Sequence, residues 1–315
     1  MPAVAGGAAH DSILDAIGNT PVVRLSRLES DGTRLYAKLE GQNPTGSVKD
    51  RIALAMVLEA ERQGQLDDDR VLLEPSSGNT GISLALVCRL KGLRLAVVMP
   101  ESASEERRRL LELYGVEVHL SPGEEGTNGA IKVAQEMASD TKYLMLNQYE
   151  NAANPAAHEV TAAEIVADVP DLDLFVAGLG TGGTLTGAGR ALKRHNPDIK
   201  VVAAEPPAGD LVQGLRSLED GYIPPILDQS VLDRKFMVGS ADAFRMTRTL
   251  FELEGVFAGI SSGAAVFGAL RAMASLGSRT AVVLLADGGW KYVSTGVHVQ
   301  DPEEVERRLQ GQIWW

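Results

Sequence analysis

Short runs rich in β-branched residues alternate along this chain with longer segments that carry apolar residues at helical spacing. This alternation favours an α/β fold with parallel sheets that are covered by helices on both faces. The predicted strands are residues 34–40, 70–75, 94–100, 116–120, 142–147, 173–178, 199–205 and 280–287. The predicted helices include residues 81–89, 105–114, 130–138, 156–167, 185–195 and 264–274.

The length of 315 residues is enough for two domains. The segment NQYENAANP, residues 147–155, is the best internal boundary. We therefore expect a smaller N-terminal α/β domain over residues 35–150 and a larger one built from residues 12–34 together with residues 151–315. The stretch 206–230 is rich in glycine and proline and longer than an ordinary connection. Loops of this kind are usually functional or disordered, and this one keeps enough apolar residues to pack.

The charge of the chain argues against binding of nucleic acid or an anionic membrane, because 42 acidic residues outnumber 30 basic ones. The three arginines at residues 107–109 are interpreted as a solvated helix face, and no metal site is predicted. The single cysteine, Cys88, predicts a reducing compartment. No apolar run is long enough to cross a bilayer and the first ten residues lack the features of a secretion signal, so we expect a cytoplasmic protein.

The segment NPTGSVKDR, residues 43–51, places a lysine at an unusual position. Ser47 is a good N-cap for a helix predicted over residues 48–62, which puts Lys49 in the first turn. The helix dipole disfavours a cation there. One interpretation is a solvated lysine whose stem swings clear of the helix end. The other is an amine with a lowered pKa that acts as a nucleophile.

Two polar, glycine-rich loops each follow a predicted strand and precede a predicted helix. In the first, EPSSGNTG at residues 74–81, four short polar side chains crowd one helix start, an arrangement that suits a carboxylate or a phosphate. In the second, residues 177–189, successive backbone N–H groups and two threonine hydroxyls would face a phosphate.

The second loop also admits a dinucleotide site. Gly178, Gly180 and Gly183 match the pattern G-x-G-x-x-G, and Glu205 ends the next predicted strand. Taken alone, this pattern predicts NAD. Against it, such a fingerprint usually lies in the first strand-helix unit, whereas several strands precede this one. The hydroxyls of Thr181 and Thr184 favour a loop that surrounds a terminal phosphate.

Lys49 and the two loops together offer an amine that can trap an aldehyde, a carboxylate site and a phosphate site. Pyridoxal 5'-phosphate requires this set, because its phosphate anchors it and its aldehyde bonds to a lysine. An amino acid substrate then displaces that lysine while its own carboxylate is held. The segment GISSGAA adds Ser261 or Ser262 at a helix start, where a hydroxyl can bond the pyridine nitrogen.

The chain resembles the fold type II pyridoxal phosphate enzymes, whose fold is that of the tryptophan synthase β chain, and within them the cysteine synthases. NPTGSVKDR, EPSSGNTG, GLGTGGT and GISSGAA occur in the family's order over nearly the whole chain. The resemblance implies two doubly wound α/β domains with the active site between them, and a homodimer.

The resemblance also implies a role for each motif residue. Lys49 would form the Schiff base, Asn79 would bond the phenolic oxygen of the cofactor, and Ser261 would face its pyridine nitrogen. The residues implied to hold the cofactor phosphate are Gly180, Thr181, Gly182, Gly183 and Thr184. The residues implied to hold the substrate carboxylate are Ser76, Ser77, Thr80 and Gln148. Where this chain has Ser76 the family more often has threonine, and the hydroxyl is kept.

These roles imply a β-replacement. A serine at the pyridine nitrogen makes the ring a moderate electron sink, which favours β-elimination over transamination. Lys49, once displaced, lies beside Cα as a base. Loss of the β-substituent leaves an aminoacrylate, and addition of a sulfur nucleophile gives L-cysteine.

Arg216, in QGLRSLEDGYIPP, stands where the O-acetylserine enzymes usually have a small residue. The chain looks more like the cysteine synthase B branch, especially its actinobacterial O-phosphoserine type, which also has an arginine here and a short tail resembling GQIWW. A guanidinium pairs a phosphate bidentately, so Arg216 favours O-phosphoserine over O-acetylserine as substrate. A surface arginine is the alternative interpretation. In that type the sulfur donor is a small thiocarboxylated carrier protein, and free sulfide is the other candidate.

Three alternatives stay open. Another β-eliminase or dehydratase of the same fold type, such as a threonine synthase or a serine dehydratase, would share the motifs. An NAD-dependent dehydrogenase rests on the glycine pattern alone. A non-catalytic protein of this fold is disfavoured because Lys49 and Asn79 are both present.

Overall fold

The computed structural model describes residues 9–67, 69–76, 78–103 and 105–309. Its strands are β1 (Val22–Arg24), β2 (Arg34–Leu39), β3 (Val71–Pro75), β4 (Arg94–Pro100), β5 (Glu117–Ser121), β6 (Tyr143–Met145), β7 (Leu174–Gly178), β8 (Lys200–Glu205), β9 (Arg234–Met237) and β10 (Thr280–Leu285). Its α-helices are α1 (Lys49–Arg62), α2 (Asn79–Lys91), α3 (Glu105–Leu113), α4 (Gly126–Met137), α5 (Ala153–Asp168), α6 (Gly183–His195), α7 (Ser240–Glu254), α8 (Ile260–Leu276) and α9 (Pro302–Leu309). Six short 3-10 helices, η1 to η6, complete this part of the chain; among them are η2 (Glu40–Gln42) and η6 (Gly289–Thr295).

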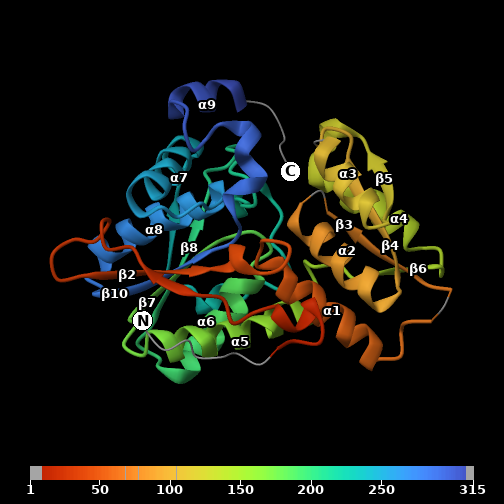
Figure 1. The fold of residues 1–315 in the computed structure, drawn as a ribbon, viewed down its shortest axis with the longest axis horizontal. Coiled ribbons are helices and arrows are strands. Elements are labelled where there is room, and N and C mark those ends of the chain that lie inside the picture. Colours follow the sequence, from red (N-terminus) through yellow and green to blue (C-terminus); the bar gives the residue numbers. More distant parts are fainter. Residues whose placement is uncertain (1–8, 68, 77, 104, 310–315) are drawn as a thin grey trace.

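The strands form two sheets, which confirms the predicted α/β class. The larger sheet has the order β1-β2-β10-β7-β8-β9, and all its pairs are parallel except β1 with β2. The smaller sheet has the order β5-β4-β3-β6 and is parallel throughout. In Figure 1 the two sheets lie in separate lobes, with α7 and α8 on one side of the larger sheet and α5 and α6 on the other.

The central strands are apolar on both faces because helices cover both. In β10, Val282 and Leu284 pack in the cluster that contains Leu185 of α6, whereas Ala281 and Val283 pack with Val266 of α8. The smaller sheet repeats this alternation. Alternate side chains of β3 and β4 face either α1 and α2 or α4. Successive strand residues point to opposite faces, so a parallel strand buried on both sides reads as one continuous apolar run.

The expected domain division needs a correction at its start. β2 pairs with β1 and β10 in the larger sheet, so the smaller unit cannot begin at residue 35 and must begin after β2. Residue 150 does separate the last strand of the smaller sheet from α5, which packs on the larger one. That the two units are separate domains stays a prediction.

Two further details bear on the site. Helix α1 begins at Lys49 with Val48 at the N-cap, so the predicted cap Ser47 lies one residue too early; its hydroxyl still accepts the N–H of Lys49 at 3.3 Å. The tail at residues 310–315 lies outside the described residues. Among the described helices, none has the length and apolar character needed to span a membrane.

Candidate active site

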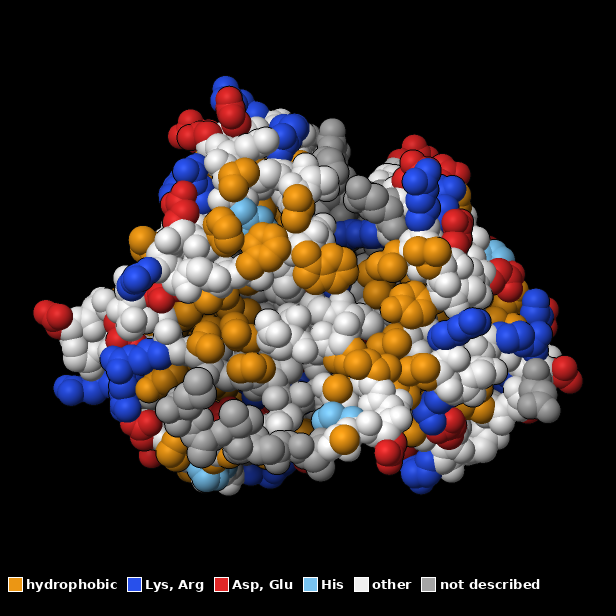
Figure 2. Space-filling model, viewed as in Figure 1, with side chains coloured by type: hydrophobic (Ala, Val, Ile, Leu, Met, Phe, Trp, Pro, Cys, Tyr) orange, Lys and Arg blue, Asp and Glu red, His pale blue; other side chains and the backbone are white. Residues whose placement is uncertain are grey.

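The predicted site residues meet in two connected cavities between the sheets. Figure 2 shows a hollow between the two lobes with a Lys or Arg side chain inside it. The inner cavity is lined by seven of the residues singled out in the sequence: Lys49, Asn79, Gly180, Thr181, Gly182, Thr184 and Ser261. The outer cavity shares Lys49, Asn79, Gly180 and Thr181 and adds Ser76, Thr80, Gln148 and Arg216. Ser77 lies outside the described residues.

Lys49 is half-buried at the start of α1, which excludes the solvated interpretation. Burial lowers the pKa of its amine to about 8, although the nearby carboxylate of Asp287 acts in the opposite direction. Within the described part of the chain, no group accepts a hydrogen bond from Lys49 Nζ. Lys49 is therefore an unengaged amine that is partly neutral near physiological pH.

The second glycine-rich loop turns from β7 into α6 at the inner cavity. Gly182 has φ +83°, which favours glycine, and it occupies the N-cap of α6 without any side-chain cap. The N–H of Gly183 donates to Thr181 Oγ1 at 3.3 Å. Among the described residues no side chain accepts the N–H of Thr184 or Leu185, so these two first-turn groups of α6 suit an anion. Gly183 does not line the cavity. A Cβ at this position would lie 1.9 Å from Asn154 Oδ1, so its lack of a side chain serves packing.

Asn154 and His158 of α5 support this loop from behind. Asn154 Nδ2 donates to the carbonyl of Gln148 at 2.7 Å and to Thr181 Oγ1 at 3.3 Å. His158 Nε2 lies 3.2 Å from Thr184 Oγ1. Burial holds the pKa of His158 well below its usual range, so this ring is neutral at physiological pH. The sequence offered no signal for either residue, because nothing in it shows that α5 packs against α6.

The first loop ends at the start of α2, where the N-cap residue is Gly78 and so has no side chain to cap the helix. Ser76 Oγ accepts the N–H groups of Gly78 at 3.3 Å and Gly81 at 3.2 Å, which leaves its own O–H free to donate. Thr80 Oγ1 donates to Gln148 Oε1 at 2.6 Å and so leaves the Gln148 amide N–H groups for another acceptor. This face of the outer cavity presents donors, as a carboxylate requires.

Glu74 lies beneath this donor face. Its Oε1 accepts the N–H of Gln148 at 3.2 Å, and its Oε2 has no partner among the described residues. The side chain is fully buried at the carboxyl end of β3, and burial raises the pKa of Glu74 to about 8.

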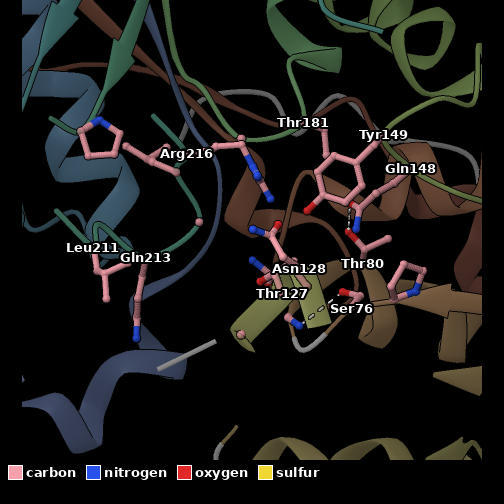
Figure 3. Close-up of a pocket in the computed structure, with 18 of the residues that line it drawn as sticks. Ser76, Thr80, Thr127, Asn128, Gln148, Tyr149, Thr181, Leu211, Gln213 and Arg216 are labelled. Carbon is pink, nitrogen blue, oxygen red and sulfur yellow. Dashed lines mark hydrogen bonds between the residues drawn. The ribbon is translucent and has the colours of Figure 1, made fainter. Parts of the chain in front are cut away.

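Arg216 lies on the opposite wall of the outer cavity. Its guanidinium carbon is 5.4 Å from the ring centre of Tyr149 and 4.8 Å from that of Tyr222. In Figure 3 the side chains of Arg216, Tyr149 and Asn128 point toward one another across the space that Ser76 and Thr80 also face.

The backbone of this wall belongs to the irregular stretch 206–230, several of whose residues line the outer cavity. That this stretch has a function stays a prediction. Arg216 N–H donates to the carbonyl of Leu179 at 2.8 Å and ties the stretch to the loop after β7. Among the described residues Arg216 forms no ion pair within 4 Å, and its side chain lines the outer cavity beside the rings of Tyr149 and Tyr222.

Of the two neighbouring serines at the start of α8, Ser261 is the one that faces the inner cavity. It lies in the first turn of α8 and lines the inner cavity, 5 % exposed, whereas Ser262 is fully buried and does not line it. The backbone opposite is Gly214, where a Cβ would lie 3.6 Å from Ser261 Oγ.

Two charged residues escaped the sequence reasoning. Arg107 lines the outer cavity, so the interpretation of residues 107–109 as a solvated face is wrong for its first member. Asp287 lines the inner cavity beside Lys49. A signal existed for Asp287, because it directly follows the last predicted strand, and sites in parallel sheets lie beyond the carboxyl ends of strands.

The chain matches the family model described as "Pyridoxal-phosphate dependent enzyme" over residues 13–288. A cysteine synthase from Staphylococcus aureus is 44% identical over 303 residues, which cover 92% of this chain and 98% of that protein. The crystal structure of O-acetyl serine sulfhydrylase isoform 3 from Entamoeba histolytica superposes with a TM-score of 0.87 at 32% identity and covers 96% of both chains. An O-ureido-L-serine synthase superposes with a TM-score of 0.87 at 40% identity, over 93% of this chain and 97% of that one.

Proposed function

The chain belongs to the family of pyridoxal-phosphate dependent enzymes, and on this premise we propose that it forms L-cysteine by replacing the β-substituent of an activated L-serine with sulfur. The observation that carries the proposal is Lys49, an unengaged amine with a pKa of about 8 in a cavity lined with anion-binding groups. The similarity to a cysteine synthase and to an O-acetyl serine sulfhydrylase supports the same activity.

Pyridoxal 5'-phosphate suits the groups that line the inner cavity. We assign its phosphate to the start of α6 with Gly180, Thr181, Gly182 and Thr184, because the N–H groups of Thr184 and Leu185 there have no side-chain acceptor among the described residues. Gly180 must lack a side chain here, since a Cβ would lie 2.9 Å from the carbonyl oxygen of Gly214. We expect Gly183 to contribute space for Asn154. We assign the covalent bond to Lys49, the phenolic oxygen to Asn79 and the pyridine nitrogen to Ser261.

When bound, this cofactor withdraws electrons from Cα of an attached amino acid, which acidifies the α-proton and lets a β-substituent leave. Lys49 takes up that proton, because its amine carries a substantial neutral fraction near pH 8. The substrate carboxylate accepts hydrogen bonds from Ser76, from Gln148 and from the N–H groups at the start of α2, including that of Thr80. Ser77 belongs to the same loop and stays a predicted member of this set.

We propose O-phospho-L-serine as the preferred substrate, with O-acetyl-L-serine as the alternative. Arg216 supports this choice, because it lines the cavity opposite the groups that would donate to the substrate carboxylate. The rings of Tyr149 and Tyr222 flank its guanidinium, which has no acidic partner among the described residues. A guanidinium held by two rings is preorganised for bidentate pairing with a phosphate. The neutral acetyl group would gain little from it.

The test compares Arg216→Ala with the unchanged enzyme on both substrates. Loss of a buried charge-assisted pair should lower kcat/KM for O-phosphoserine by roughly 10- to 1000-fold, while turnover of O-acetylserine changes much less. Arg190→Ala serves as the matched control, because Arg190 of α6 is an exposed arginine that pairs with Asp228. Equal losses on both substrates for Arg216→Ala would remove the assignment of the phosphate to this residue.

The sulfur donor and the assembly are also proposals. We propose that a thiocarboxylated carrier protein or free sulfide delivers sulfur through the outer cavity. We further propose a cytoplasmic homodimer. Apolar side chains that are 39% to 69% exposed support an interface, among them Phe251, Phe257 and Val299, and the rings of Phe251 and Phe257 both contact His298. Light scattering that gave the mass of a monomer at micromolar concentration would count against the dimer.

A further inference from the structure

A buried carboxylate beside Lys49 has no part in the reaction derived above. Asp287 follows β10 and is 2% exposed. Its backbone is fixed, because its carbonyl accepts the N–H of Gly259 at 3.0 Å and it forms an antiparallel bridge with Ser47, two residues before Lys49. Asp287 and Lys49 line the same inner cavity.

Two donors hold one oxygen of this carboxylate and leave the other unbonded. Oδ2 accepts from Asn79 Nδ2 at 2.8 Å and from the hydroxyl of Tyr292 at 2.8 Å. Oδ1 has no hydrogen-bond partner in the described part of the chain. It lies against Gly259, where a Cβ would come within 2.1 Å of it. A buried carboxylate with an unsatisfied oxygen is costly unless a positive charge compensates it.

Lys291 sets the orientation of this arrangement. Its ammonium donates to Asn79 Oδ1. An ammonium has donors and no acceptor, so it fixes the amide of Asn79 with its oxygen toward Lys291 and its NH2 group toward Asp287. Lys291 therefore acts on the carboxylate through Asn79.

The charged and titratable groups around Lys49 come from several elements: Asp287, Lys291 and Tyr292 after β10, Asp50 and Arg51 on α1, His158 on α5, and Arg107 on α3. Asp50 is engaged elsewhere, since Thr45 N–H and Ser83 Oγ donate to its carboxylate at 2.7 and 2.5 Å. His158 is neutral, and Arg107 and Lys291 are cations. Asp287 is thus the anion that favours the protonated form of Lys49.

We propose that Asp287 is a positioning residue for the proton transfer: it stabilises the ammonium of Lys49 after that lysine has taken the α-proton, and Asn79, Tyr292 and Lys291 hold its carboxylate for this task. The inference rests on the proposed role of Lys49 as the base. An ammonium formed in a buried cavity is unfavourable without an opposite charge nearby. No hydrogen bond joins Asp287 to Lys49 in the described structure, so the carboxylate acts through space.

The first test measures the protonation of Lys49 itself. In the full-length protein freed of cofactor, competitive acetylation with acetic anhydride across pH, read by mass spectrometry of the peptide that contains Lys49, gives the titration midpoint of this amine. Asp287→Asn should lower the midpoint by about one pH unit, the size expected for a nearby opposite charge. Asp287→Glu, which restores the charge, should bring it back toward the original value. Asp287→Ser offers the same charge removal if Asp287→Asn does not fold.

Asp50→Asn is the matched control, because it removes a buried aspartate adjacent to Lys49 in the chain whose carboxylate bonds to Thr45 and Ser83. Its midpoint should equal that of the unchanged protein. A midpoint that stays within about 0.2 units in both Asp287→Asn and Asp287→Ser would overturn the inference, given the unit or more expected for a lost charge partner.

The second test separates this inference from the proposed function. In the holoenzyme, rapid mixing with O-phosphoserine gives the rate of phosphate release, which follows loss of the α-proton, as a function of pH. Asp287→Asn should move the acidic, ascending limb of this profile to lower pH in parallel with the labelling midpoint, because Lys49 must be deprotonated to act as the base. The weaker base should also slow the step on the plateau by up to about 10-fold, as one pH unit implies. If the labelling midpoint moves and the profile does not, Lys49 is not the base. If cysteine is not formed at all, the proposed function fails while the labelling result still stands.

Discussion

Replacing Glu74 with glutamine removes a proton-binding group from beneath the substrate pocket and should change how stability depends on pH. Glu74 is fully buried, its Oε2 has no partner among the described residues, and burial raises its pKa from the ordinary 4.5 to about 8. Glutamine keeps the shape and the carbonyl that accepts the N–H of Gln148. The variant therefore isolates the proton.

The raised pKa of Glu74 makes the folded protein less stable as the pH rises. Between pH 4.5 and about 8 the folded protein holds a proton on Glu74 that the unfolded chain has lost, so unfolding releases it. The free energy of unfolding contributed by Glu74 is then fully present below pH 4.5 and declines as the pH rises toward 8. Each pH unit in this window is worth at most about 1.4 kcal/mol. Between pH 5.5 and 7.5 the total is about 2–3 kcal/mol.

Urea unfolding at pH 5.5, 6.5 and 7.5, with the unchanged protein and Glu74→Gln side by side, measures this quantity. Other titrating groups are shared by the two proteins and cancel in the difference between their unfolding free energies. Glu74→Gln should gain stability relative to the unchanged protein as the pH rises. Parallel stability curves for the two proteins would refute the reasoning, because they would mean that Glu74 binds no proton in this range.

Two further predictions concern the second glycine-rich loop and the residues of α5 that support it. Gly183→Ala should weaken binding of the cofactor by roughly 10-fold or more, because the added Cβ would displace Asn154 and with it Thr181. Equilibrium dialysis measures the dissociation constant of the cofactor, and an unchanged constant would contradict the packing role of Gly183. His158→Gln should reduce the loss of stability below pH 6.5, because burial depresses the pKa of His158 and the folded state loses stability as this ring must take up a proton. Urea unfolding at pH 5 and 7 checks it, and identical pH dependence in both proteins would be contrary to the prediction.

Much of the fold could be predicted from the sequence, because buried parallel strands appear there as continuous apolar runs. All eight predicted strands are present, and the α/β class and the fold type II architecture are confirmed by the sheets and by the similarity to the sulfhydrylase structure. Two strands were missed. β1 and β9 are three and four residues long, lie at the edges of the sheet and carry exposed residues, so they lack the apolar run that marks a central strand.

The position of the site could also be predicted from the sequence, because its glycine-rich loops follow predicted strands. Lys49, Asn79, Thr181 and Ser261 come from four distant segments, and the structure places them around one cavity. The roles of residues that act through tertiary contacts could not be predicted from the sequence. His158 lies in a helix that was predicted over residues 156–167 from its apolar spacing alone, and Asn154 lies before that predicted start. Arg107 lies in a basic run that, from the sequence alone, resembles any solvated helix face.

The most direct test of the account asks which lysine carries the cofactor. Borohydride converts a lysine–cofactor double bond to a stable amine, and mass spectrometry of the digested protein then identifies the modified residue. The account predicts modification at Lys49, and it predicts that Lys49→Ala loses both the visible absorbance of the cofactor and cysteine formation. Lys291 is the matched control, because it is another half-buried lysine in the same region. Modification at Lys291, or undiminished turnover by Lys49→Ala, would contradict the account.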